Sequence, residues 1–183
     1  AHWGLSNPKY GCGPDDAVGP LTVSATAEYP PKDAVWNTAT RYRVECVYPN
    51  KVDVVIAGGY DEIKSGAKWY GPNGWVSVTR GTIDASNRQW IREIQDREKK
   101  GDLDIQLFKS PGHQQEFLDC VRSRKRTLTP VEVAHRSQTP GHLGHIAALL
   151  GRTLKWDAAK EEIVGDPEAS KLMGKQMRAP WKV

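Results

Sequence analysis

The chain has 183 residues, with 26 Lys and Arg against 22 Asp and Glu, which gives a formal net charge of +4. This length suits one ordinary domain with a buried core, and so small a charge excess does not by itself indicate a nucleic-acid partner. No window approaches the roughly 18 apolar residues of a membrane span, and Cys12, Cys46 and Cys120 are too scattered for a disulfide framework or a zinc ribbon.

Residues 1–34 are expected to form a loop-rich entry segment. Gly, Pro, Asn and Asp are frequent over residues 6–34, and only Leu21–Thr26 has the composition of an extended strand. Neither an initiating Met nor a basic and apolar leader opens the chain. We therefore expect a fragment or a processed product of a longer protein.

Two β-hairpins are predicted in the middle of the chain. Apolar and charged residues alternate over 41–48, and the apolar run 52–56 follows after a short turn. Residues 68–70 and 75–79 flank Asn73-Gly74, a pair that readily supplies the positive φ of a tight turn. Such alternation is typical of an antiparallel sheet with one face in water.

Beyond the hairpins, the period of the apolar residues changes. The polar run 97–102 is predicted to be a surface loop. Residues 113–124 and 142–150 each have apolar side chains at helical spacing, and Gly151 is suited to end the second helix. The apolar stripe of each helix should lie on the sheet.

The C-terminal part predicts a short hairpin and one more helix. Residues 153–156 and 162–164 have strand character, and Asp166-Pro167-Glu168 supplies an N-cap, an N1 proline and an acidic first turn. The predicted fold class is therefore α+β: an open, predominantly antiparallel β-sheet with helices packed on one face.

Histidines are the first candidates for a functional site. His135, His142 and His145 would fall within about 80° of one another on an unbroken helix. Pro140-Gly141 is expected to interrupt that helix, and the Glu of an HExxH zinc site is missing, so we assign no metal ligands. Two interpretations stay open: imidazoles at the sheet boundary or in solvent, and a cleft of His, Arg and Trp side chains that recognises hydroxyl or carboxylate groups.

Other chemical signals are weaker. The basic run 122–126 could contact phosphates, but cations are also favoured at the C-terminus of a helix. The seven Trp side chains could stack on sugar rings or could be core anchors. The sequence has no GxSxG, papain-like Cys box or P-loop, and Asp16 stands where Gly11-Cys12-Gly13 would need its third glycine.

Several stretches occur in a specific order along the chain: Trp36–Thr40, Tyr42–Glu45, Gly74–Val76 with Arg80-Gly81, Phe117–Ser123, Pro130–Ser137, His142–Ala147, Gly151–Asp157 and Ala179–Trp181. Together they resemble the C-terminal domain of Gfo/Idh/MocA-type oxidoreductases, especially the bacterial branch. The resemblance covers residues 1–183 and implies a single domain for substrate binding and oligomerisation.

The resemblance implies a two-domain parent protein whose N-terminal Rossmann domain, absent here, binds NAD or NADP. The dinucleotide glycines, the Lys of the family's Glu-Lys-Pro motif and its catalytic His have no counterpart, and His2 is not that His. No catalytic, cofactor-binding or metal residue is therefore expected in this chain, nor NAD or NADP bound by it alone. The parent would transfer hydride between the nicotinamide and the CH–OH carbon of a sugar, sugar derivative or polyol.

The expected substrate-binding residues are His135, Arg136 and His142, because polar groups on this segment are hard to explain as core. The expected partners are a sugar or polyol and a further copy of the chain at the open sheet face, with no nucleic acid and no membrane. A stand-alone carbohydrate- or protein-binding module and an NAD-dependent glycoside-cleaving enzyme are the alternatives. Some members of the bacterial branch carry twin-arginine export signals, so both the cytoplasm and the periplasm stay open.

Overall fold

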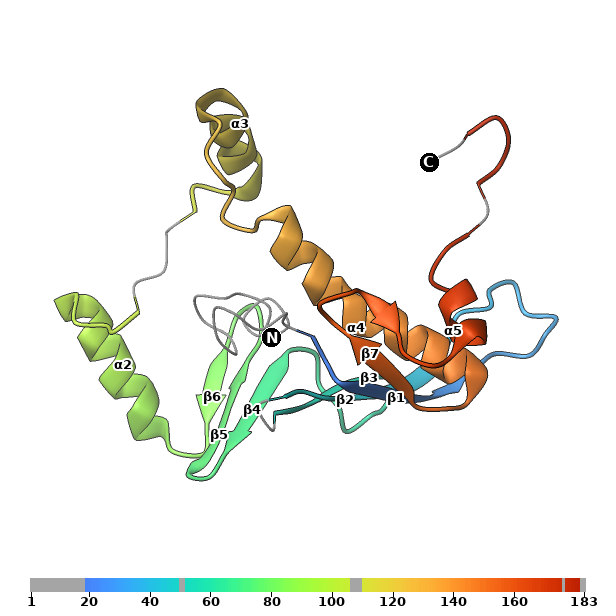
Figure 1. Cartoon of the computed structure of the whole chain (residues 1–183). Helices are drawn as coiled ribbons and strands as arrows, with labels where there is room; N and C mark the ends of the chain where they lie inside the picture. Colours follow the sequence, from blue (N-terminus) through green and yellow to red (C-terminus); the bar gives the residue numbers. More distant parts are fainter. Residues whose placement is uncertain (1–18, 50–51, 106–109, 176, 182–183) are drawn as a thin grey trace. The chain divides into compact units, whose positions relative to one another are not determined.

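The computed structural model describes residues 19–49, 52–105, 110–175 and 177–181 (Figure 1). The chain forms two compact units, which we call unit 1 (Ala1–Ile63 and Pro130–Val183) and unit 2 (Lys64–Thr129). The sequence pattern gave no sign of this division. Both units combine antiparallel strands with helices, as the α+β class requires.

Unit 1 contains a five-stranded sheet in the order β3-β2-β1-β7-β8. Its strands are β1 (Thr22–Glu28), β2 (Arg41–Val47), β3 (Asp53–Gly58), β7 (Leu154–Asp157) and β8 (Glu162–Ile163). Every neighbouring pair is antiparallel, so the predicted hairpins β2-β3 and β7-β8 are confirmed. The strand predicted near residue 21 is β1, in the middle of the sheet.

One face of this sheet forms the core of unit 1. Val23 of β1 pairs with Cys46 of β2 on one side and with Leu154 of β7 on the other. All three side chains are almost completely buried. Successive strand residues point to opposite faces, so the intervening residues of the same strands point away from this core.

Helix α4 (Val131–Leu150) covers the core face of the sheet. Leu143, Ile146 and Ala147 are buried against the strands, and α4 contacts both β1 and β2 (Figure 1). The helix ends at Gly151, whose left-handed φ of 63° lets its N–H donate to the Ala147 carbonyl. The predicted glycine stop is confirmed.

The prediction that Pro140-Gly141 interrupts this helix was wrong, because α4 passes through both residues as one helix of 20 residues. A proline in a helix interior removes one N–H donor and costs about 3 kcal/mol. Pro140 is among the most completely buried side chains, on the side of α4 that meets the core. Burial of this apolar stripe offsets the lost hydrogen bond, a contribution that local propensity does not contain.

The final helix, α5 (Pro167–Lys171), begins as the sequence predicts. Asp166 is its N-cap and accepts from the Ala169 N–H at 3.0 Å. Arg152, just after α4, donates from Nε and Nη2 to both carboxylate oxygens of Asp166, and from Nη2 to Glu168. This cluster ties the end of α4 to the start of α5.

Unit 2 contains a three-stranded antiparallel sheet in the order β4-β5-β6. Its elements are β4 (Ala67–Gly71), β5 (Gly74–Val78), β6 (Ile83–Ala85), α2 (Arg88–Lys100) and α3 (His113–Ser123). The predicted β4-β5 hairpin is confirmed, with Gly71 paired to Gly74. The residue with a positive φ is Gly74, the first residue of β5, with φ 145°.

The prediction of a surface loop over residues 97–102 was wrong, because this run is the last turn of α2 and its cap. Arg97, Lys99 and Lys100 lie where the helix dipole favours cations. Gly101, with φ 69°, donates its N–H to the last carbonyls and ends the helix. The sequence reading missed α2, although Trp90, Ile91 and Ile94 have helical spacing.

Helix α3 is confirmed, but its apolar stripe does not lie on a sheet within unit 2. Phe117, Leu118 and Val121 are 61%, 47% and 45% exposed. Helix α2 contacts β6, the strand just before it in sequence, and has no buried residue. Across the described parts of both units, no helix is long and apolar enough to cross a membrane.

Candidate functional site

The three residues predicted to face substrate all lie in the first part or the middle of α4. Because α4 is unbroken, His135 and His142 are seven residues apart, close to two full helical turns, and lie on the same side of the helix. Both are exposed, and their side of the helix is turned away from the core that Leu143 and Ala147 enter. The structure therefore places these two imidazoles along one accessible strip, which we call the histidine strip.

Glu161 joins the histidine strip from a distant part of the chain. His135 Nε2 lies 2.9 Å from Glu161 Oε1, and their side chains are 54% and 48% exposed. Glu161 lies in the turn between β7 and β8, where Asp157 Oδ1 accepts from the Ala159 and Lys160 N–H groups. Its φ of 55° is uncommon for a residue with a β-carbon. The sequence reading missed Glu161, and only the turn-forming Asp157 signals the loop that positions it.

Arg136 lies apart from the histidine strip. It is four residues before Pro140 and seven before Leu143, so it lies nearer the core side of the helix. Its guanidinium pairs with Glu132 one turn earlier, with both Nε and Nη2 at 2.8 Å from Oε1, and its side chain is 29% exposed. A ligand that uses Arg136 must compete with this carboxylate.

The second surface of interest is the sheet face opposite α4. Arg43 and Glu45 of β2 point to this side and are joined by a hydrogen bond of 2.8 Å. Next to them, Val47 and Val55 are 44% and 47% exposed. Among the described elements of unit 1, the helices α4 and α5 pack on the core side, so no helix covers this face. We call it the open face.

The other sequence candidates have more ordinary surroundings. The basic run 122–126 lies at and beyond the end of α3, as the helix-dipole interpretation predicts. Trp156 is buried in the core of unit 1, whereas Trp36, Trp69 and Trp181 are 61%, 47% and 67% exposed. Within the described ranges, no group of three or more His, Cys, Asp and Glu is arranged to hold a metal ion.

The residues present do not fit a dinucleotide. A Rossmann site needs parallel strands joined by a helix and a GxGxxG loop at the helix N-terminus. All strand pairs among the described residues are antiparallel, and the sequence has no GxGxxG segment. NAD or NADP would therefore need a site that the described residues of this chain do not form.

A helix packed by one side on an antiparallel sheet, with no described helix on the other face, defines a two-layer α+β domain. Residues 7–183 match the oxidoreductase family, C-terminal alpha/beta domain, and the chain belongs to this Gfo/Idh/MocA family. The comparisons with curated proteins and with solved structures found no match.

Proposed function

We propose that this chain is the substrate-binding and oligomerisation domain of an oxidoreductase that transfers hydride between NAD or NADP and the CH–OH carbon of a sugar, sugar derivative or polyol. The observation that carries the proposal is the match of residues 7–183 to the C-terminal domain of an oxidoreductase family. Because that match concerns a C-terminal domain, the proposal assigns the dinucleotide to another domain of the protein.

The histidine strip supports a polyhydroxylated substrate. A neutral imidazole has one N–H donor and one acceptor nitrogen, so His135 and His142 can each donate to or accept from a hydroxyl group. Glu161 adds a carboxylate, which can accept hydrogen bonds from hydroxyl groups; its Oε1 lies 2.9 Å from His135 Nε2. Donors and acceptors spread along two helical turns match a ligand with several hydroxyl groups. The role of this chain is then to bind and orient the substrate.

Calorimetric titration of the chain with glucose, gluconate and myo-inositol tests the substrate role. Heat of binding is expected with at least one of the three compounds. His142→Ala should weaken that binding about tenfold, the loss expected when one hydrogen-bonding side chain is removed. His113→Ala, at the exposed start of α3, is the matched control and should bind as the unaltered chain does. No heat with any of the three compounds would contradict the proposal.

The open face supports the oligomerisation role. A sheet face that no described helix covers, with Val47 and Val55 exposed next to an Arg43–Glu45 pair, offers apolar and charged groups to a second copy. A stable interface needs about 800 Å² from each partner.

Light scattering on the purified chain tests this role. We expect a dimer or larger oligomer that dissociates in Val55→Arg, because the new cation would be buried beside Arg43, and Glu45, its cross-strand neighbour, already pairs with Arg43. Val131→Arg changes a valine that is 84% exposed at the start of α4 and should leave the oligomer intact. A monomer at high concentration of the unaltered chain would disprove the assignment.

A further inference from the structure

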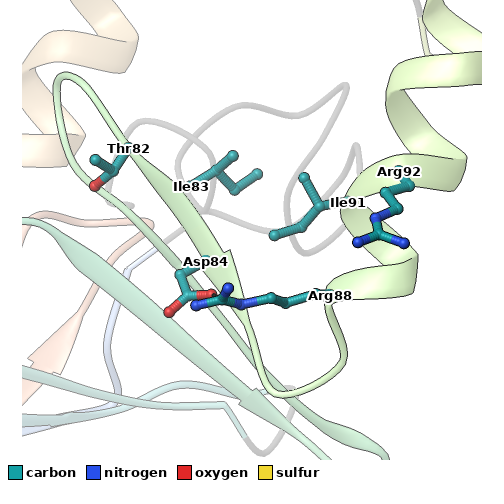
Figure 2. A pocket seen from close by; sticks show the side chains of 6 residues that line it. All are labelled: Thr82, Ile83, Asp84, Arg88, Ile91 and Arg92. Carbon is teal, nitrogen blue, oxygen red and sulfur yellow. Dashed lines mark ion pairs between the residues drawn. The ribbon is translucent and has the colours of Figure 1, made fainter.

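Unit 2 contains a cavity that the proposed function does not use. It lies between β6 and the first half of α2 and has a volume of about 490 Å³ (Figure 2). This volume is within the range of about 300–1,000 Å³ for sites that bind small molecules. The lining residues are Thr82, Ile83, Asp84, Arg88, Ile91 and Arg92.

Two guanidinium groups line the cavity from one side of α2. Arg88 and Arg92 are four residues apart, so they lie one above the other on the helix. Arg88 Nε is 3.7 Å from Asp84 Oδ1, a long and exposed contact that holds the side chain weakly. Within the described part of the chain, Arg92 forms no ion pair. Both groups therefore keep N–H donors for an oxyanion, which a guanidinium can bind with two parallel hydrogen bonds.

Two isoleucines form the apolar part of the cavity. Ile83 of β6 and Ile91 of α2 point toward one another across it (Figure 2). Ile83 is 49% exposed, so the pair leaves apolar surface in contact with water. The cavity thus combines an apolar gap with cations at its edge, the arrangement typical of sites for organic anions.

Asp84 limits the charge that the cavity can accept. With Arg88 and Arg92, it leaves the lining with a net charge of +1, and its Oδ1 already accepts from the Ala85 N–H at 2.9 Å. A second negative charge on the ligand would lie near this carboxylate and be repelled. The lining therefore favours a singly charged carboxylate over a phosphate dianion.

We propose that the cavity between β6 and α2 binds a small organic carboxylate, with its apolar body between Ile83 and Ile91 and its carboxylate on Arg88 and Arg92. This proposal is independent of the function assigned to unit 1. The expected ligand is a monoanion with a short hydrocarbon body.

Titration of the ¹⁵N-labelled chain with hexanoate, followed in amide ¹H–¹⁵N spectra, tests the proposal. Saturable shifts are expected for residues 82–92. Hexanol, which lacks the charge, and acetate, which lacks the body, should each bind at least about tenfold more weakly, as should hexyl phosphate in its dianionic form. Absence of saturable shifts with hexanoate would overturn the proposal, and so would equal affinity for hexanol or for acetate.

Variants locate the site. Arg92→Gln keeps a good helix former and should weaken hexanoate binding about tenfold, whereas Arg122→Gln on α3 should not change it. Arg88→Gln is the second variant, read by the same spectra, which also report whether each variant is folded. Unchanged affinity in both cavity variants would overturn the assignment, and shifts confined to residues outside unit 2 would do the same.

Discussion

Gly144 of α4 lies directly against Val44 of β2, so closely that a β-carbon at position 144 would be 2.6 Å from both valine methyl carbons. The glycine therefore sets how near the helix approaches the sheet. Its conformation is helical, so the need for glycine comes from space alone.

Gly144→Ala is therefore expected to lower the free energy of unfolding. Overpacking in a core costs about 1–3 kcal/mol, while replacing a helical glycine by alanine returns about 1 kcal/mol, so a net loss of up to about 2 kcal/mol is expected. Urea unfolding followed by circular dichroism measures it. Gly141→Ala is the matched control, because no atom lies within 4 Å of its added β-carbon, and it should gain about 0.5–1 kcal/mol. Equal stability of the two variants would refute the argument.

The Arg152–Asp166 pair predicts acid sensitivity. The hydrogen bonds from Arg152, then that from the Ala169 N–H, lower the pKa of Asp166 from 3.8 to about 2. A carboxylate whose pKa is lowered on folding stabilises the fold fully above its unfolded pKa and loses that effect as the pH falls. The melting temperature should therefore fall between pH 4 and pH 2, and Asp166→Asn should flatten this part of the curve. Asp53→Asn is the control: this residue is exposed at the start of β3, and the substitution should not change how the melting temperature depends on pH.

Cys46 is predicted to resist alkylation in the folded chain. Burial raises the pKa of its thiol to about 11, and the side chain is 1% exposed. At pH 8 only about one molecule in a thousand then carries the reactive thiolate. Iodoacetamide labelling with peptide mass mapping should show rapid modification of the partly exposed Cys120 and protection of Cys46 until denaturant is added. Equal labelling rates in the native chain would count against the buried position.

Glu161→Gly should leave the fold as stable or slightly more stable. A left-handed residue with a β-carbon costs about 1–2 kcal/mol, and glycine adds about 0.5–1 kcal/mol of unfolded-state entropy, so a gain of about 0.5 kcal/mol is expected. The exposed contact with His135 contributes little. Glu162→Gly, in the extended β8, should instead lose about 0.5–1 kcal/mol. A destabilised Glu161→Gly chain in thermal unfolding would show that the contact with His135 matters more than the backbone.

The features that could be predicted from sequence are those determined by local chemistry. Alternation over residues 41–48 predicted β2, and the Asp166-Pro167 start and the Gly151 stop were correct because capping groups act on neighbouring residues. The continuous α4 could not be predicted, because the burial of Pro140 in the folded unit is not visible in local propensity. The charged end of α2 was taken for a loop because a solvated helical turn and a polar loop have similar composition.

The candidate site likewise contains residues that the sequence could suggest and a residue that it could not. The sequence suggested His135 and His142 as candidates, and the unbroken helix places them on one side. Glu161 could not be predicted from sequence, because it reaches His135 only when the β7-β8 hairpin packs near α4. Its left-handed backbone conformation is not indicated by any residue type in that turn. The cavity at β6 was equally hidden, since α2 was not predicted.

The pairing of Thr22 in β1 with Lys155 in β7 has a consequence for the order of folding. The middle strand of the unit 1 sheet finds its second neighbour, β7, more than 100 residues further along the chain, whereas every strand pair of unit 2 joins residues close in sequence. Closing so long a loop is slow and local pairing is fast. Unit 2 and the locally paired strands β1, β2 and β3 are therefore expected to acquire protection from hydrogen exchange first during refolding, with β7 protected last.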